Sequence, residues 1–259
     1  MAKPLNPFAL LGKATFRMVR DAGSITLFFL SMLRSFLTGF SLRQFIRQCS
    51  FVGVDSLPIV LLTAFFTGAV LALQSFNGLN GGPLVNTQLG KLVSASMIRE
   101  LGPVLAGLML SSRVGAAMAA ELGTMRVTEQ IDALVTLAAN PMRYLVVPRV
   151  LACLTMLPLL VVLSNVVGIG GGYVVSVHVL NVPPHAYTSG VFSVISNDDL
   201  FMTLIKAAVF GTIVGLMGTY HGFNARGGAA GVGDATTQAV VFAAVCILIS
   251  DYFITAMFV

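Results

Sequence analysis

Long uncharged runs are the feature that most limits what this chain can fold into. Leu57–Phe76 carries no charged side chain over roughly 20 residues, enough helix to cross the ~30 Å apolar core of a bilayer. Four further apolar stretches follow, separated by polar loops. Because a spanning backbone must satisfy its own hydrogen bonds, these runs must be helical. We predict an all-α integral membrane protein with spans at about 56–76, 92–122, 150–178, 200–221 and 236–258.

The overall composition agrees with a membrane protein. Hydrophobic residues make up 56% of the chain and charged residues 10%, against about 45–50% and about 25% in soluble domains. The net charge of +5 is therefore not taken as a sign of nucleic-acid binding. The cysteines (Cys49, Cys153 and Cys246) and the three histidines are scattered at no metal-ligand spacing, so we expect no metal site.

The first predicted segment is residues 1–50, and the five-span region occupies 51–259. The most apolar part of residues 1–50 is Ser24–Leu33, which ends at Arg34 after only about ten residues. That length is more typical of interfacial than of spanning helices. Basic residues lie on both sides of this part. We predict an amphipathic elbow helix at the membrane surface, with a sixth span as the alternative.

The distribution of Lys and Arg predicts the orientation of the chain in the membrane. The first fifty residues hold seven basic residues and the two other predicted inner loops hold four, whereas the outer loops hold only Lys91. Because basic loops stay on the cytoplasmic side, the N-terminus is expected inside and the C-terminus outside.

The second span is unusual because it carries charges. Arg99, Arg113 and Glu121 fall near one line of the helix, with Glu100 beside them. Charges in a span face protein or a watery cavity rather than acyl chains, so this span should line an interior. Two interpretations stay open, structural pairing and cavity lining. Gly102–Pro103 removes a backbone donor and predicts a kink.

Charged residues elsewhere suggest partners for structural ion pairs. Asp55, at the inner end of the first span, is a candidate partner for Arg113. Lys206 and Asp251 lie at similar depths in the fourth and fifth spans, and we expect them to neutralise each other.

Glycines recur on the fourth span at Gly211, Gly215, Gly218 and Gly222. This spacing lets neighbouring helices approach closely in lipid. We interpret it as a packing surface and not as a ligand site.

A short amphipathic helix is predicted at about 126–138, in an inner loop. Its apolar positions are Val127, Ile131, Leu134 and Ala138, and Asn140–Pro141 ends it. Its polar side is acidic, which suits a protein partner better than anionic lipid.

No G-x-x-x-x-G-K-[ST] motif occurs, since Gly90-Lys91 is followed by Leu92. Any ATP-driven motor must therefore be another chain.

The run IRELGPVLAGLMLSSRVGAAMAAELGTMRVTEQIDAL, residues 98–134, resembles the signature region of the MlaE (YrbE) permeases. Members of that family are membrane subunits of ABC transporters that move phospholipid between the two membranes of Gram-negative bacteria. The similarity extends over most of the chain, including the elbow helix, the five spans and the Lys206 and Asp251 positions.

The resemblance implies a homodimer in the bacterial inner membrane, two cytoplasmic ABC ATPase subunits that hold ATP and Mg, and a periplasmic MCE-domain protein. No cofactor is expected in this chain. The 126–138 helix would be the coupling helix, with contacts from Thr128, Glu129, Gln130, Ile131, Asp132 and Leu134. A phospholipid path at the dimer centre would be lined by Leu71, Gln74, Phe76, Arg99 and Glu100.

Two hypotheses of other classes remain at this stage. The chain is a self-sufficient ion-coupled secondary transporter or channel if its intramembrane charges form a relay. Five spans without a detectable internal repeat count against the usual inverted-repeat design. The chain is only a membrane anchor if the charges of the second span do no more than pack.

Overall fold

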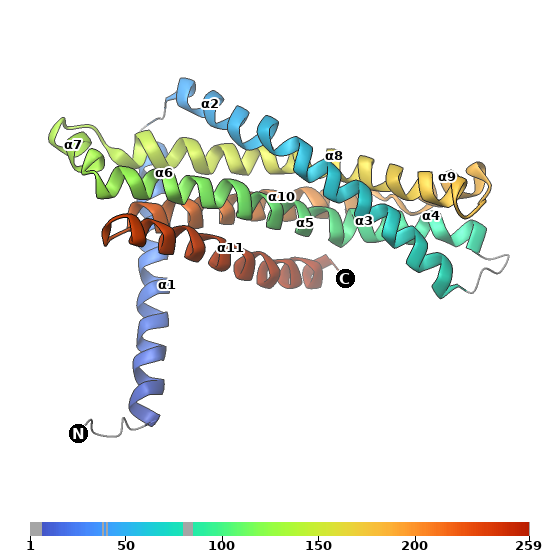
Figure 1. The fold of residues 1–259 in the computed structure, drawn as a ribbon, viewed down its shortest axis with the longest axis horizontal. Helices are drawn as coiled ribbons and strands as arrows, with labels where there is room; N and C mark the ends of the chain where they lie inside the picture. The colour runs from blue at the N-terminus through green and yellow to red at the C-terminus, as the bar shows by residue number, and fades with distance from the viewer. Residues whose placement is uncertain (1–6, 38, 40, 80–84, 259) are drawn as a thin grey trace.

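The computed structural model describes residues 7–37, 39, 41–79 and 85–258, and within them the regular structure is entirely helical. Five helical stretches are long and apolar enough to cross a membrane, which confirms the predicted fold class. They are Leu42–Gly78, Gln88–Val127, Met142–His178, Asn197–Phe223 and Gly228–Phe258. Figure 1 shows them side by side as one elongated bundle.

The first stretch begins well before the predicted span. The amphipathic helix α2 (Leu42–Gly53) continues through the 3-10 turn η1 (Val54–Ser56) into the apolar helix α3 (Leu57–Gly78). Pro58 is tolerated because it lies in the first turn of α3, where its missing N–H has no helical partner. The predicted segment boundary at residue 50 therefore lies inside α2, within a continuous helical stretch.

The helix α1 (Pro7–Leu37) is set apart from the bundle, and it is not among the five candidate spans. In Figure 1 it runs across the direction of the other long helices, at one end of the bundle. Phe28 and Met32 anchor it against Val146 and Val147 near the start of the third stretch.

The second stretch is built from five helical pieces in line, α4 (Val85–Ser96), η2 (Met97–Leu101), α5 (Gly102–Leu110), η3 (Ser111–Gly115) and α6 (Ala116–Val127). Two of them, η2 and η3, are π turns. The first π turn ends immediately before Gly102–Pro103, where the proline removes a backbone donor and disturbs the α-helical ladder. Helix α4 also begins earlier than the predicted span start at 92.

The long helix α8 (Val147–His178), preceded by the π turn η4 (Met142–Val146), packs against α2, α3 and α10. Gly68 of α3 faces the backbone of Gly168 on α8 so closely that a Cβ added to Gly68 would lie 1.8 Å from the Gly168 carbonyl oxygen. Glycines at this crossing thus bring two spans into backbone contact.

The connection before the fourth stretch contains a helix where the sequence predicted a loop. Helix α9 (Pro184–Val194) packs on α4, with Leu89, Tyr187 and Val191 in a buried cluster. The Tyr187 hydroxyl donates to the backbone oxygen of Ile169 at 3.0 Å. Burial raises the pKa of Tyr187, so the hydroxyl keeps its proton for this bond.

The last two spans, α10 (Asn197–Phe223) and α11 (Gly228–Phe258), pack against each other and against α6. The predicted glycine face of α10 is used for packing on both sides. Gly211 lies against the backbone of Cys153 on α8, and Gly222 lies against that of Ala119 on α6. Short side chains at these positions let α10 sit between its two neighbours.

Replacing Gly68 with Ala should destabilise the bundle by about 1–3 kcal/mol, because the added methyl group overpacks the α3–α8 contact. Gly170→Ala is the matched control, since a Cβ at that position meets nothing within 4 Å. Thermal unfolding in detergent, followed by circular dichroism, checks the difference. Equal melting temperatures for the two variants would contradict the close contact.

Candidate functional site

A fully buried lysine is the centre of the charged site. Lys206 of α10 has no solvent-exposed side-chain surface, and its ammonium nitrogen has three oxygen neighbours. It lies 2.7 Å from Asp251 of α11, 2.9 Å from Glu100 of the π turn η2, and 2.8 Å from the backbone oxygen of Arg99. Its hydrogen bond goes to the Arg99 carbonyl, and both carboxylates lie within ion-pair distance.

This cluster joins three spans through one cation. The expected Lys206–Asp251 pair is present, and Glu100 joins it as a second carboxylate. Thr255, one turn further along α11, donates to Glu100 at 3.0 Å. With two carboxylates on one ammonium, the cluster carries a formal charge of −1 and has acceptor capacity left on the side where Glu100 is 41% exposed.

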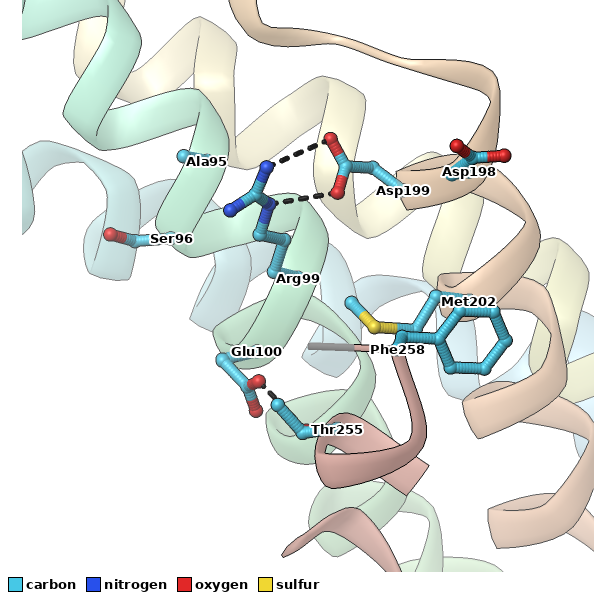
Figure 2. A pocket seen from close by; sticks show the side chains of 9 residues that line it. All are labelled: Ala95, Ser96, Arg99, Glu100, Asp198, Asp199, Met202, Thr255 and Phe258. Carbon is cyan, nitrogen blue, oxygen red and sulfur yellow. Dashed lines mark hydrogen bonds and ion pairs between the residues drawn. The ribbon is translucent and has the colours of Figure 1, made fainter. Parts of the chain in front are cut away.

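Arg99 makes a separate ion pair. Its guanidinium binds Asp199 through two parallel contacts, Nε at 2.8 Å and a terminal nitrogen at 3.2 Å (Figure 2). This two-pronged geometry fixes the orientation of both side chains. Asp199 lies in the first turn of α10, where the Ser196 hydroxyl caps the helix by accepting from the Asp199 amide.

Glu100 of the cluster and the Arg99–Asp199 pair line a common cavity of about 450 Å³. Figure 2 shows Arg99 and Asp199 on one side and Glu100 with Thr255 on the other. The remaining lining residues are Ala95, Ser96, Asp198, Met202 and Phe258. We call this space the charged hollow.

A second space, the apolar hollow, lies on α3. It measures about 320 Å³ and is lined by Phe66, Thr67, Val70, Leu71, Gln74 and Leu101. Leu71 and Gln74 therefore line a different cavity from Arg99 and Glu100, although Leu101 directly follows Glu100. Phe76 lines neither hollow and packs instead against the buried cluster around Tyr187. The structure thus divides the five path residues between two cavities and one packing contact.

The charges nearer the other end of the second stretch are satisfied by neighbouring helices. Arg113, in the π turn η3, bonds to the Ser56 hydroxyl at 2.6 Å and the Phe51 carbonyl at 3.2 Å. Asp55 lies 3.7 Å from the guanidinium, as expected. Glu121 pairs at 2.9 Å with the almost fully buried Arg149, which the sequence had placed in a loop.

The predicted 126–138 helix does not exist as one piece. Helix α6 continues to Val127, and the short helix α7 (Gln130–Thr136) starts after a break. Glu129 at the break has a φ of 61°, a left-handed conformation incompatible with a continuing α-helix. Ala138, with a φ of 55°, lies beyond the end of α7.

The apolar side of α7 faces its own bundle. Ile131 is 1% exposed and packs with Leu122 and Leu145, and Leu134 is half-buried beside them. The polar residues predicted for coupling, Thr128, Glu129, Gln130 and Asp132, are exposed, and Asp132 pairs with Arg126 at 2.6 Å. Beyond them Val135 and Leu137 are exposed apolar side chains, 57% and 78%, that were not among the predicted contacts.

Comparison with known proteins identifies the family of this bundle. Residues 45–257 match the family described as Permease MlaE. The chain belongs to the MlaE permease family. A probable ABC transporter permease protein of Rickettsia felis is 45% identical over 255 residues, 98% of each chain. A probable ABC transporter permease protein of Synechocystis is 43% identical over 214 residues, which cover 82% of this chain and 81% of that one.

A plant protein is also similar. The chloroplastic protein trigalactosyldiacylglycerol 1 of Arabidopsis thaliana is 34% identical over 219 residues, which cover 83% of this chain and 61% of that protein. The resemblance noted in the sequence is thereby confirmed, and the chain is an ABC transporter permease of the MlaE family.

In this MlaE permease, Asp199 is the partner of Arg99 that sequence reasoning missed. It was placed at the end of an outer loop because the fourth span was expected to start at 200. The signal that identifies its position is the helix-capping Ser196, three residues earlier. Among the residues that the structure describes, no group of three or more His, Cys, Asp or Glu side chains is placed to hold a metal ion.

Replacing Lys206 with Met should destabilise the MlaE permease by about 3–5 kcal/mol, because it leaves Glu100 and Asp251 as unpaired carboxylates inside the bundle. Adding Glu100→Gln and Asp251→Asn to the same variant should recover most of the loss. The melting temperature in detergent measures both effects. Lys91→Met, at an exposed lysine, is the control. Equally small shifts of the melting temperature in Lys206→Met and Lys91→Met would contradict the role of the cluster.

Proposed function

We propose that this chain is the permease subunit of an ABC transporter that moves phospholipid or a similar lipid between two membranes, with ATP hydrolysed in a separate chain. The observation that carries the proposal is that one π turn contributes to both hollows. The apolar hollow includes Leu101, and the charged hollow includes Arg99 and Glu100 of the same π turn. A chain that offers both an apolar and a charged cavity suits a molecule with acyl chains and a polar headgroup.

Membership of the family supports a proposal for the assembly. We infer a homodimer in the bacterial inner membrane that binds two cytoplasmic ABC ATPases and a periplasmic MCE-domain protein. The N-terminus is cytoplasmic in this proposal, and the C-terminus is periplasmic. The crosswise α1, with Leu27, Leu30 and Leu33 exposed, then lies as an elbow helix in the inner membrane surface.

The connection between α6 and α7 is the proposed contact with the ATPase. Ile131 ties α7 to the bundle, so the exposed residues of this segment move with the second span. Thr128, Glu129, Gln130 and Asp132 offer a polar surface, and Val135 with Leu137 adds an apolar one. Such a mixed surface matches the composition of protein interfaces.

The rival function is an ion-coupled secondary transporter, favoured by the buried Lys206 with its two carboxylates. Reconstitution in proteoliposomes separates the two. With its ATPase, the protein should transfer labelled phospholipid to acceptor vesicles only when ATP and Mg are present. Transfer or ion flux by the permease alone, driven by a proton or sodium gradient, would contradict the ABC proposal.

Replacing Leu137 with Asp should weaken ATPase binding about tenfold or more, because it puts a charge on the exposed apolar part of the contact surface. Phe192→Asp is the matched control, since Phe192 is similarly exposed but lies on α9 at the other end of the bundle. Co-purification with the ATPase measures the effect, and equal recovery of the ATPase with both variants would contradict the proposed contact. Variants at Ile131 are unsuitable for this purpose, because that side chain is core.

Replacing Leu71 with Trp should lower ATP-driven lipid transfer at least tenfold, because the larger ring fills the apolar hollow. Leu73→Trp, two residues away at a 38% exposed position that does not line the hollow, should leave transfer nearly unchanged. Transfer rates per assembled complex compare the two variants. If both retain full activity, the path does not pass through the apolar hollow.

A further inference from the structure

A third cavity lies where α1 passes the end of the bundle, apart from both hollows described above. It measures about 360 Å³, within the size range of small-molecule sites. Its walls come from four segments far apart in the sequence, namely α1, the last turn of α10, the α10–α11 loop and the first half of α11. We call it the crossing pocket.

The crossing pocket holds charges of both signs. Asp21 of α1, Arg226 of the loop and Asp234 of α11 all line it. Within the part of the chain that the structure describes, none of the three forms an ion pair. The charged side chains of the Lys206 cluster and of the Arg99–Asp199 pair contact one another, whereas those of this pocket form no such contacts in the described part of the chain.

One ring nitrogen of His221 in this pocket is buried without a hydrogen bond of good geometry among the residues that the structure describes. The ring of His221 stacks on Phe242 with centroids 5.2 Å apart, and Gln238 lies beside it. Nevertheless His221 Nε2 is buried and makes no hydrogen bond of good geometry within the described residues. Because buried polar atoms in native proteins are nearly always bonded, this orphan points to a ligand or water in the pocket.

The surroundings of the pocket are apolar on the side away from the loop. Asp234, Gln238 and Phe242 follow one another at four-residue intervals on one face of α11. Past Phe242 the helix exposes Val245 and Ile249, and only 11% of its most apolar window is buried within the chain. A charged pocket therefore opens beside an apolar strip that runs toward the bilayer centre.

We propose that the crossing pocket binds the headgroup of an aminophospholipid, distinct from the transport path. The phosphate lies on Arg226, the primary ammonium lies between Asp21 and Asp234, and the acyl chains lie along α11. Charges of both signs suit a zwitterion, and the apolar strip suits the chains. This inference depends on the proposed function only in that the protein sits in a bilayer.

The arrangement predicts discrimination between two common zwitterionic lipids. A primary ammonium donates up to three hydrogen bonds to the carboxylates, whereas the quaternary ammonium of choline donates none. Losing one charge-assisted hydrogen bond corresponds to about a tenfold loss of affinity. Phosphatidylethanolamine should therefore occupy the pocket at about one tenth of the membrane fraction that phosphatidylcholine needs.

The absence of tryptophan from the chain makes this measurable. Phe242→Trp places a single fluorophore at the pocket while keeping an aromatic ring beside His221. The full-length protein is reconstituted in bilayers that contain rising fractions of dibrominated phosphatidylethanolamine or dibrominated phosphatidylcholine. Bromine quenches a nearby tryptophan, so the ethanolamine lipid should quench at the lower fraction. Equal quenching curves would overturn the proposal.

Further variants of the Phe242→Trp protein test the role of each charged side chain in the pocket. Asp21→Asn with Asp234→Asn should abolish the preference for ethanolamine, and Arg226→Gln should weaken both lipids while keeping their ratio. Arg34→Gln, at an exposed arginine of α1 outside the pocket, should change neither. Loss of the preference in Arg34→Gln would mean that general surface charge produces it. If the Asp21→Asn and Asp234→Asn variant does not fold, the comparison of the two lipids in the Phe242→Trp protein still tests the proposal.

A last comparison distinguishes a lipid from a soluble ligand of the same chemistry. O-phosphoethanolamine carries the same phosphate and ammonium without acyl chains. It should relieve quenching only at concentrations far above those of the lipid, and efficient relief would overturn the lipid assignment. ATPase binding in the same samples should be unaffected, so a failure here is distinguishable from a failure of the proposed function.

Discussion

The three-way contact of Lys206 is the interaction on which the arrangement of the bundle around the charged hollow depends. A buried ammonium without partners would lose several kcal/mol of solvation, so the fold must supply acceptors. It supplies them from two other helices, Glu100 with the Arg99 carbonyl from the second stretch and Asp251 from α11. The requirement therefore fixes the rotation of three spans relative to one another, and with it the walls of the charged hollow.

The π turn η2 makes that contact possible. An extra residue in a helical turn shifts the direction of the side chains that follow, and it leaves carbonyls free for other partners. Here the Arg99 carbonyl accepts from Lys206, and consecutive side chains of the turn reach different places: Arg99 meets Asp199, Glu100 meets Lys206, and Leu101 lines the apolar hollow. One local irregularity thus serves two cavities and two ion pairs.

The parts of this structure that could be predicted from sequence are those that depend on local pattern. Five spans follow from apolar run length, and the Lys206–Asp251 pair follows from depth and charge. The Arg99–Asp199 pair could not be predicted from the sequence. Which residue pairs with Arg99 depends on how the helices are rotated and on the start of α10, which Ser196 caps. The helix break at Glu129 was not predicted either, because a single non-glycine residue in the left-handed conformation does not change the hydrophobic periodicity of the sequence. The inward burial of Ile131 likewise depends on tertiary packing, which periodicity alone does not specify.

The continuity of the second stretch has a mechanical consequence. Helical backbone runs from Gln88 to Val127 without a loop, so the charged hollow at one end and the α7 segment at the other belong to a single rod. Ile131 clamps α7 to that rod. In the proposed transporter, a displacement at α7 would act on the same backbone that carries the charged hollow. The two π turns interrupt the α-helical hydrogen bonding of this stretch, and helices commonly kink at such turns.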